Sequence, residues 1–407
     1  MSRRTGKTTA RPRPMYPALK MPPRVAPALA ASAAEPDDRL TTLVQRASQH
    51  ILAVTYWFEP APQPQPYPVT IRFTGRRVDV EGKLERRDQF VQDETIAQVV
   101  PGSGPISVTA RVRDIHPGAW EVNAAVVAPP HRGRAARPRE SVLPIGAPRG
   151  LLTRIWRRWA TVADGHQPVN TSLEPWARVP GALGSIWGGW VTLGMIVAVV
   201  AQVLLFAHFQ RAVGPVLIST LGAIAVGIAG AKVWYIVKHR NEELALHRYN
   251  GWCIQGFITG ATLTALLLLM VLHAPVGAAL DLTTPGLMFG LAVGRIGCFF
   301  AGCCGGPPTA AVWGIWSSDQ RVGARRVPTQ LMESSVALIF GLVTLAALLA
   351  RGPDSGAYFA AAVAGYTLVR EGILRLRVEQ VKIRLPVPVT PIVSALVVVV
   401  SLVLLAR

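Results

Sequence analysis

The second half of the chain is a series of apolar segments separated by short polar breaks. An α-helix needs roughly 20 consecutive, mostly apolar residues to cross the hydrocarbon core of a bilayer. Segments that meet this requirement lie near residues 184–208, 213–237, 251–273, 285–303, 331–350, 357–376 and 391–406. The pattern predicts an all-α polytopic membrane protein with about seven transmembrane helices in residues 184–407.

The first half has a different organisation. Residues 1–47 are rich in Arg, Pro and Ala without periodicity, which predicts a disordered basic tail. Residues 48–130 alternate apolar and polar side chains between Pro/Gly turns, which predicts about six short strands in a small β-sandwich-like accessory domain. The clearest of these strands are Ile51–Phe58, Tyr67–Phe73, Ile106–Val112 and Trp120–Val126.

Residues 131–183 form a basic linker followed by a short amphipathic segment. The segment starts at Leu151 and interleaves Trp with Arg, which is typical of a helix lying on a membrane surface. The alternative is a helix that packs on the sandwich. The formal net charge of +19 favours contact with anionic phospholipid headgroups. No aromatic–basic motif of a nucleic-acid-binding module is present, so no nucleic-acid partner is expected.

One arginine lies within the fourth apolar segment. Arg295 follows a stripe of small residues, Gly286, Gly290 and Gly294, that we expect to pack closely against another helix. An arginine at membrane depth is costly unless an anionic or polar group pairs with it, so it indicates a functional site. Arg326 comes just before the fifth segment and is the second such candidate.

Further arginines are expected on the same side of the membrane if the segments alternate in direction. Arg370 and Arg377 lie at the end of the sixth segment. Guanidinium groups bind phosphate bidentately and keep their charge when partly buried. The cluster therefore predicts a phospholipid headgroup site, and ordinary positive-inside charge is the alternative explanation.

Three of the four cysteines, Cys298, Cys303 and Cys304, follow closely on Arg295. Their C-x4-C-C spacing without a nearby histidine is not a recognised zinc pattern, so neither a metal nor another cofactor is expected. Small apolar packing is the simpler interpretation. A disulfide is the alternative if this end faces an oxidising compartment.

Several motifs on these segments resemble, in order, the signature segments of the prolipoprotein diacylglyceryl transferase family. The resemblance covers most of 184–407 and leaves the N-terminal half outside. The matching segments are Gly294–Gly297 with Gly302 and Gly306 (family GRIGNF.NGE..G), Trp313-Gly314 (PWG), Arg326–Glu333 (RHPSQLYE), Ala229–Tyr235 (GARLxY), Asn250–Ala261 (GG…HGGLIGA) and Gly365–Arg377 (the penultimate helix).

The resemblance implies a multi-pass enzyme of the bacterial plasma (inner) membrane. It would transfer diacylglyceryl from phosphatidylglycerol to the thiol of a lipobox cysteine in a preprotein, and release glycerol phosphate. The implied catalytic residues are Arg295, Arg326, Glu333 and Gln255. The implied substrate-binding residues are Gly294, Gly297, Gly302, Gly306, Gln330, Tyr235, Asn250, Arg370 and Arg377.

The chain also departs from the family pattern. Gln255 stands where the family commonly has His, Cys298 where it has Asn, and Cys303 where it has an acidic residue. Phosphate-holding residues are kept while proton-handling ones are replaced. A catalytically divergent or inactive protein that binds anionic lipid and presents the sandwich to a partner is therefore the alternative.

The membrane orientation has two opposing indications. The family places the signature loop and the N-terminus outside. When the loops between the predicted segments are numbered in order, basic residues concentrate in the even-numbered loops, and the signature loop after the fourth segment is one of these. The positive-inside rule therefore favours the cytoplasm for the signature loop.

Overall fold

The computed structural model describes residues 50–127, 142–143, 151–159, 163, 167–173, 177–183, 186–238, 252–353, 355–378 and 389–406. All of them belong to one compact unit, Arg46–Arg407. The predicted tail, most of the linker, and Asn250 lie outside the described residues.

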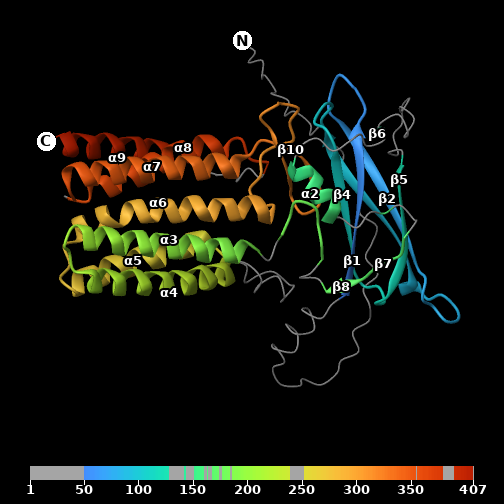
Figure 1. The fold of residues 1–407 in the computed structure, drawn as a ribbon, viewed down its shortest axis with the longest axis horizontal. Helices are drawn as coiled ribbons and strands as arrows, with labels where there is room; N and C mark the ends of the chain where they lie inside the picture. The colour runs from blue at the N-terminus through green and yellow to red at the C-terminus, as the bar shows by residue number, and fades with distance from the viewer. Residues whose placement is uncertain are drawn as a thin grey trace, which may run out of the picture. The chain divides into compact units, whose positions relative to one another are not determined.

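The apolar half forms helices that lie side by side (Figure 1), and each falls on a predicted segment. Among the described residues, six of them are long and apolar enough to cross a membrane. The remaining one, α8, is less apolar because it carries Arg370 and Glu371. The predicted fold of a multi-pass membrane protein is confirmed. The helices are α3 Ile186–His208, α4 Val213–Lys238, α5 Ile254–Val271, α6 Val276–Ala301, α7 Thr329–Arg351, α8 Ala357–Leu374 and α9 Val389–Ala406.

Helix α6 begins nine residues before the expected boundary at residue 285, and Pro285 lies inside it. The charged residue in this first part is Asp281, which is fully buried. Its two carboxylate oxygens accept hydrogen bonds from the backbone N–H groups of Gly356 and Phe359, each at 3.0 Å. These amides begin α8 and have no partner within that helix. A buried carboxylate is therefore tolerated here because it caps a neighbouring helix.

The glycine stripe of α6 packs against α3, as predicted. A Cβ atom added to Gly286 would lie 2.5 Å from the carbonyl oxygen of Ala198, and one on Gly290 would lie 2.5 Å from that of Gly194. Only glycine permits such a close backbone approach. Gly294 is different, because a Cβ there would have no neighbour within 4 Å.

The N-terminal half forms two antiparallel sheets, which confirms the predicted sandwich. Strand β1 pairs with β4 in one sheet, and the order β3-β2-β5-β7 makes the other. Their facing sides enclose a core that includes Phe58, Phe73 and Trp120. Strand β3 lies at the end of the second sheet, and several polar and charged residues interrupt its apolar ones, so apolar periodicity does not reveal it. The strands are β1 His50–Pro60, β2 Tyr67–Arg77, β3 Gln89–Val99, β4 Ile106–Val112, β5 Ala119–Val127, β6 Val142–Leu143, β7 Val169–Asn170 and β8 Ser172–Leu173.

The connection between α6 and α7 adds two strands to the first sheet. Strands β9 (Ile315–Ser318) and β10 (Val322–Arg326) form a hairpin, and β10 pairs with β4 to give the order β6-β1-β4-β10-β9. Figure 1 labels β10 and β4 on this sheet. The sandwich is therefore built partly from the membrane half of the chain.

The short helix α2 (Leu151–Trp159) contacts the same sheet. Its Trp156 is buried in a cluster with Trp57 and Trp316. The position of Trp156 therefore agrees with the alternative prediction, in which the helix packs on the sandwich. Contact of α2 with a membrane surface stays a prediction, and Arg154 and Ile155 are exposed.

The pairing of β10 with β4 has a topological consequence. It requires the α6–α7 connection to lie on the same side of the membrane as the sandwich. Because α7 spans the membrane, the α7–α8 turn lies on the opposite side. If α8 also spans, the end of α9 lies on that opposite side as well.

Labelling of introduced cysteines tests this topology. We expect Val91→Cys in β3 and Ser355→Cys in the α7–α8 turn to react with a membrane-impermeant maleimide from opposite sides. One should be labelled in intact cells and the other only after permeabilisation, above the background of the unmodified protein. Equal labelling of both in intact cells would contradict the placement of the sandwich and the α7–α8 turn on opposite sides of the membrane.

Candidate functional site

A single buried carboxylate joins three helical segments. Glu333, in the first turns of α7, has no exposed surface. Its Oε2 lies 2.8 Å from Nε of Arg295 on α6, and its Oε1 accepts a hydrogen bond from Arg377, just after α8. The Arg370 guanidinium of α8 lies 3.9 Å from Oε1. The structure thus brings together four of the predicted site residues, and we call them the arginine cluster.

The arginine cluster carries more positive than negative charge. Three guanidinium groups surround one carboxylate, and the Arg295 and Arg377 side chains are 16% and 9% exposed. Buried charges are costly unless they are compensated by partners. Glu333 can balance one of the three positive charges, so the cluster is suited to bind a further anion.

In the described part of the chain, one polar atom of the cluster and one polar atom beside it are buried without a hydrogen bond of good geometry. The hydroxyl of Tyr366 on α8 is buried and lies beside the Arg295 guanidinium. Nε of Arg377 is also buried without a hydrogen bond. Buried polar groups of this kind are usually satisfied, so unpaired ones indicate where a ligand or water would bind.

The turn Gly302–Gly306 is held against the start of α7. The side-chain amide of Gln330 donates to the carbonyl of Cys303 at 2.7 Å, and the hydroxyl of Thr329 donates to that of Cys304 at 2.8 Å. The backbone N–H of Val378 donates to the carbonyl of Gly305 at 3.2 Å. The turn therefore connects the Glu333 helix with the segment that bears Arg377.

The predicted glycines have structural roles at this end of α6. Gly302 ends α6 with a φ of +73°, and a Cβ there would lie 2.5 Å from the carbonyl of Ser318. A Cβ on Gly306 would lie 2.6 Å from the carbonyl of Val327, and one on Gly297 2.5 Å from the Cβ of Trp190. Substrate contact through these glycines stays a prediction.

Arg326 lies at the end of β10 and is outside the ion pairs of Glu333. It is 7% exposed, and its Nη2 donates to Asp319 at 2.8 Å and to the carbonyl of Val322 at 3.1 Å. Its Nε is buried without a hydrogen bond in the described structure. Arg326 and Gln330 both lie next to Gly305, since a Cβ on Gly305 would be 3.4 Å from the Gln330 amide and 3.9 Å from Cδ of Arg326. Arg326 thus borders the arginine cluster rather than joining it.

Gln255 and Tyr235 belong to a different helix pair. Gln255 is exposed at the start of α5, where its side chain contacts the Cys253 thiol at 3.7 Å. Tyr235 is half-buried on α4. The glycines around them serve close packing of α4 on α5, because a Cβ on Gly230 would lie 2.6 Å from the carbonyl of Gly256. The partner of Gln255 is Cys253, whereas those of Glu333 are arginines of other helical segments, so the described structure does not connect Gln255 with the arginine cluster.

The three cysteines after Arg295 gather at the C-terminal end of α6 as free thiols. Cys298 is buried, and the thiol of Cys303 contacts the carbonyl of Cys298 at 3.7 Å and the thiols of Cys298 and Cys304. In the described ranges, no group of His, Cys, Asp and Glu has an arrangement that would hold a metal ion.

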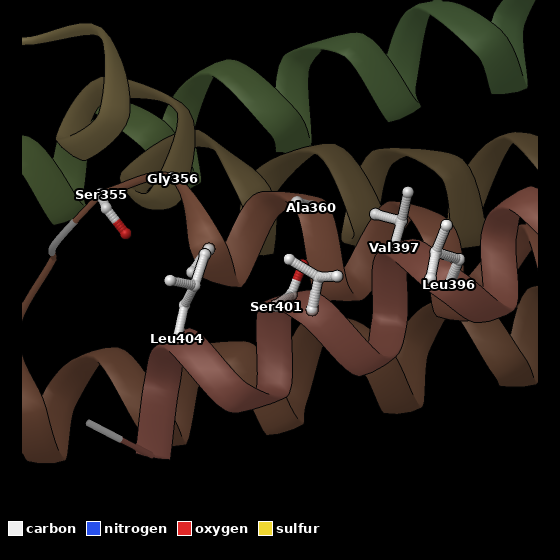
Figure 2. Close-up of a pocket in the computed structure, with 9 residues that line it drawn as sticks. Ser355, Gly356, Ala360, Leu396, Val397, Ser401 and Leu404 are labelled. Atoms are coloured by element: carbon white, nitrogen blue, oxygen red, sulfur yellow. The ribbon is translucent and has the colours of Figure 1, made fainter.

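An apolar groove lies elsewhere, between the start of α8 and α9, with a volume of about 410 Å³. Figure 2 shows its lining, which includes Gly356, Ala360, Leu396 and Ser401. The ten residues from Ala360 to Arg370 correspond to about 15 Å of helix. The groove is therefore at the opposite end of α8 from the arginine cluster.

Prediction from the sequence assigned no functional role to two residues of the site, Tyr366 and Asp319. Tyr366 stands within a segment that resembles the family, and its position one helical turn before Arg370 could have placed it on the same face. Asp319 lies in a turn, and only the hairpin geometry brings it to Arg326.

Comparison with known proteins gives a consistent match for the helical half. Residues 183–407 match the sequence model of the family described as prolipoprotein diacylglyceryl transferase. A phosphatidylglycerol–prolipoprotein diacylglyceryl transferase of Dehalococcoides mccartyi is 28% identical over 213 residues, which is 49% of this chain and 81% of that protein. One from a Nostoc species is 30% identical over 238 residues, which is 52% of this chain and 82% of that protein.

Replacing Glu333 with Gln tests the charge balance. The change keeps the shape but leaves the three arginines without their shared carboxylate, and breaking a buried ion pair costs about 3–5 kcal/mol. We expect a clearly lower midpoint of thermal unfolding in detergent. Glu371→Gln, on α8 but outside these ion pairs, is the control. An unchanged midpoint for Glu333→Gln, or an equal drop in both variants, would contradict the account.

Proposed function

The chain belongs to the prolipoprotein diacylglyceryl transferase family, and on that premise we propose that it modifies lipoprotein precursors in the plasma (inner) membrane. The proposed reaction transfers the diacylglyceryl group of phosphatidylglycerol to the thiol of a lipobox cysteine. The match of residues 183–407 to the family and the geometry of the arginine cluster support this proposal.

The observation that carries the proposal is the uncompensated positive charge around Glu333. Phosphatidylglycerol has one phosphodiester with one negative charge, and guanidinium groups bind phosphate oxygens through paired hydrogen bonds. Arg295 and Arg377 are held in place by the carboxylate they share. They therefore need little reorganisation to receive a headgroup phosphate.

The same charge favours the reaction itself. The thiolate sulfur forms a bond to the terminal glycerol carbon of the diacylglyceryl group, and the bond from that carbon to the phosphate oxygen breaks. The departing glycerol phosphate carries two negative charges until it takes up a proton, whereas the diester carries one. Two excess positive charges thus match the leaving group better than the substrate, which is the condition for catalysis.

The cationic surroundings also help to activate the acceptor. A cysteine next to arginines ionises more readily, and the thiolate is the nucleophile. Gln255 cannot accept a proton at neutral pH, so it is not a general base here. In this proposal the thiol proton leaves with water or with the glycerol phosphate.

A non-catalytic lipid-binding protein is the second candidate. It is favoured by Gln255 and Cys303, which replace the family's histidine and acidic residue, and by the exposed position of Gln255. Such a protein would retain intact phosphatidylglycerol after long incubation with an acceptor peptide.

Transfer of labelled diacylglyceryl from phosphatidylglycerol to a lipobox peptide tests the proposal. We expect Arg377→Gln to lower kcat/KM by about 100-fold or more, the usual cost of losing one donor to a developing oxyanion. Arg351→Gln is the matched control, since Arg351 lies at the other end of α7 and donates to the carbonyl of Leu405.

Complementation of a strain depleted of its own transferase provides the cellular test. The unmodified chain and Arg351→Gln should restore growth, and Arg377→Gln should not. Absence of transfer by the unmodified protein with every cysteine acceptor would contradict the proposed function.

A further inference from the structure

We propose that the N-terminal sandwich is a positioning part of the transfer site: it holds the β9–β10 hairpin and thereby fixes Arg326 beside the arginine cluster. The family match begins at residue 183, so strands β1 to β8 of the sandwich lie outside it. The measurement of transfer activity rests on the proposed function, whereas hydrogen exchange of the hairpin tests the inference independently of it.

The first link is through the backbone. Strand β10 pairs antiparallel with β4, with Val322 opposite Val108 and Gly323 opposite Ser107. The N–H of Thr109 also donates to the carbonyl of Arg321 at 2.8 Å. The hairpin is therefore the continuation of the sandwich sheet.

The second link is aromatic. Trp57 of β1 stacks on Trp316 of β9 with ring centroids 5.4 Å apart and planes at 18°. The indole N–H of Trp316 donates to the carbonyl of Pro105 at 3.0 Å. Phe300 at the end of α6 packs on this cluster and stacks on Trp190 of α3 at 5.8 Å. Aromatic contacts thus run from the sandwich through the hairpin to two membrane helices.

The third link is ionic and reaches the second sheet. Nε of Arg321, in the hairpin turn, lies 2.9 Å from the Glu94 carboxylate on β3, and its Nη2 donates to the carbonyl of Thr95 at 3.0 Å. The hairpin is therefore attached to both layers of the sandwich.

The hairpin carries groups that border the arginine cluster. Both partners of Arg326, Asp319 and the Val322 carbonyl, belong to the same hairpin. Only Val327 and Pro328 separate Arg326 from α7, which bears Glu333. A shift of the hairpin would move Arg326 and the first turn of α7 together, and a displacement of about 1 Å can cost about 100-fold in rate.

Variants of the full-length protein at Trp57 test the aromatic link. We expect Trp57→Ala to lower transfer by about 10- to 100-fold, mainly in kcat, and Trp57→Phe to recover most of it. Hydrogen exchange should show faster exchange of the amides of 322–326 in Trp57→Ala, with unchanged exchange in α4 and α5.

A charge reversal tests the ionic link, in which the Arg321 side chain is 57% exposed and the Glu94 side chain 13% exposed. Glu94→Arg and Arg321→Glu should each lower transfer by about two- to fivefold, and the double variant should restore it. The matched control is Arg72→Glu, because Arg72 pairs with Asp93 at 2.7 Å within the sandwich and away from the hairpin. It should leave transfer unchanged.

The outcomes separate the two proposals. Unchanged transfer and unchanged hairpin exchange in Trp57→Ala, or no rescue in the double reversal, would overturn the positioning role. Absence of transfer by the unmodified protein would overturn the proposed function instead. The exchange of residues 322–326 would then still decide whether the sandwich holds the hairpin.

Discussion

The ion pairs of Glu333 with arginines from two other helical segments are the interaction on which this structure depends. A carboxylate without exposed surface ties α6, α7 and the end of α8 together at one side of the membrane half. Its single charge stabilises three guanidiniums only in part. The same contacts therefore organise the helices and leave a positive site for a phosphate group.

The helices and the convergence of the arginines could be predicted from the sequence because both follow from alternation across a bilayer. The start of α6 could not be predicted in this way. The buried carboxylate of Asp281 accepts its hydrogen bonds from the N-terminus of α8, which is distant in the sequence. Arg295 and Arg326 were the two arginines that the sequence singled out as candidates for the site. The structure groups Arg295 with Arg370 and Arg377 and pairs Arg326 with Asp319, because a hairpin turn directs it there.

The sandwich was predictable from its two-residue periodicity, but its last two strands were not. The segment Val322–Arg326 has the composition of a basic loop, and its pairing with β4 joins residues more than 200 positions apart. Such non-local pairing leaves no local signal. It makes the N-terminal half a neighbour of the site, although its own sequence carries no catalytic pattern.

The central claim is that the excess positive charge around Glu333 holds a lipid phosphate, and native mass spectrometry of bound phospholipid tests it most directly. The unmodified protein in mixed micelles should retain phosphatidylglycerol in preference to phosphatidylcholine. Arg295→Gln and Arg377→Gln should lose that preference, while Arg351→Gln should keep it. Equal retention of both lipids by the unmodified protein, or an unchanged preference in the two cluster variants, would contradict the account.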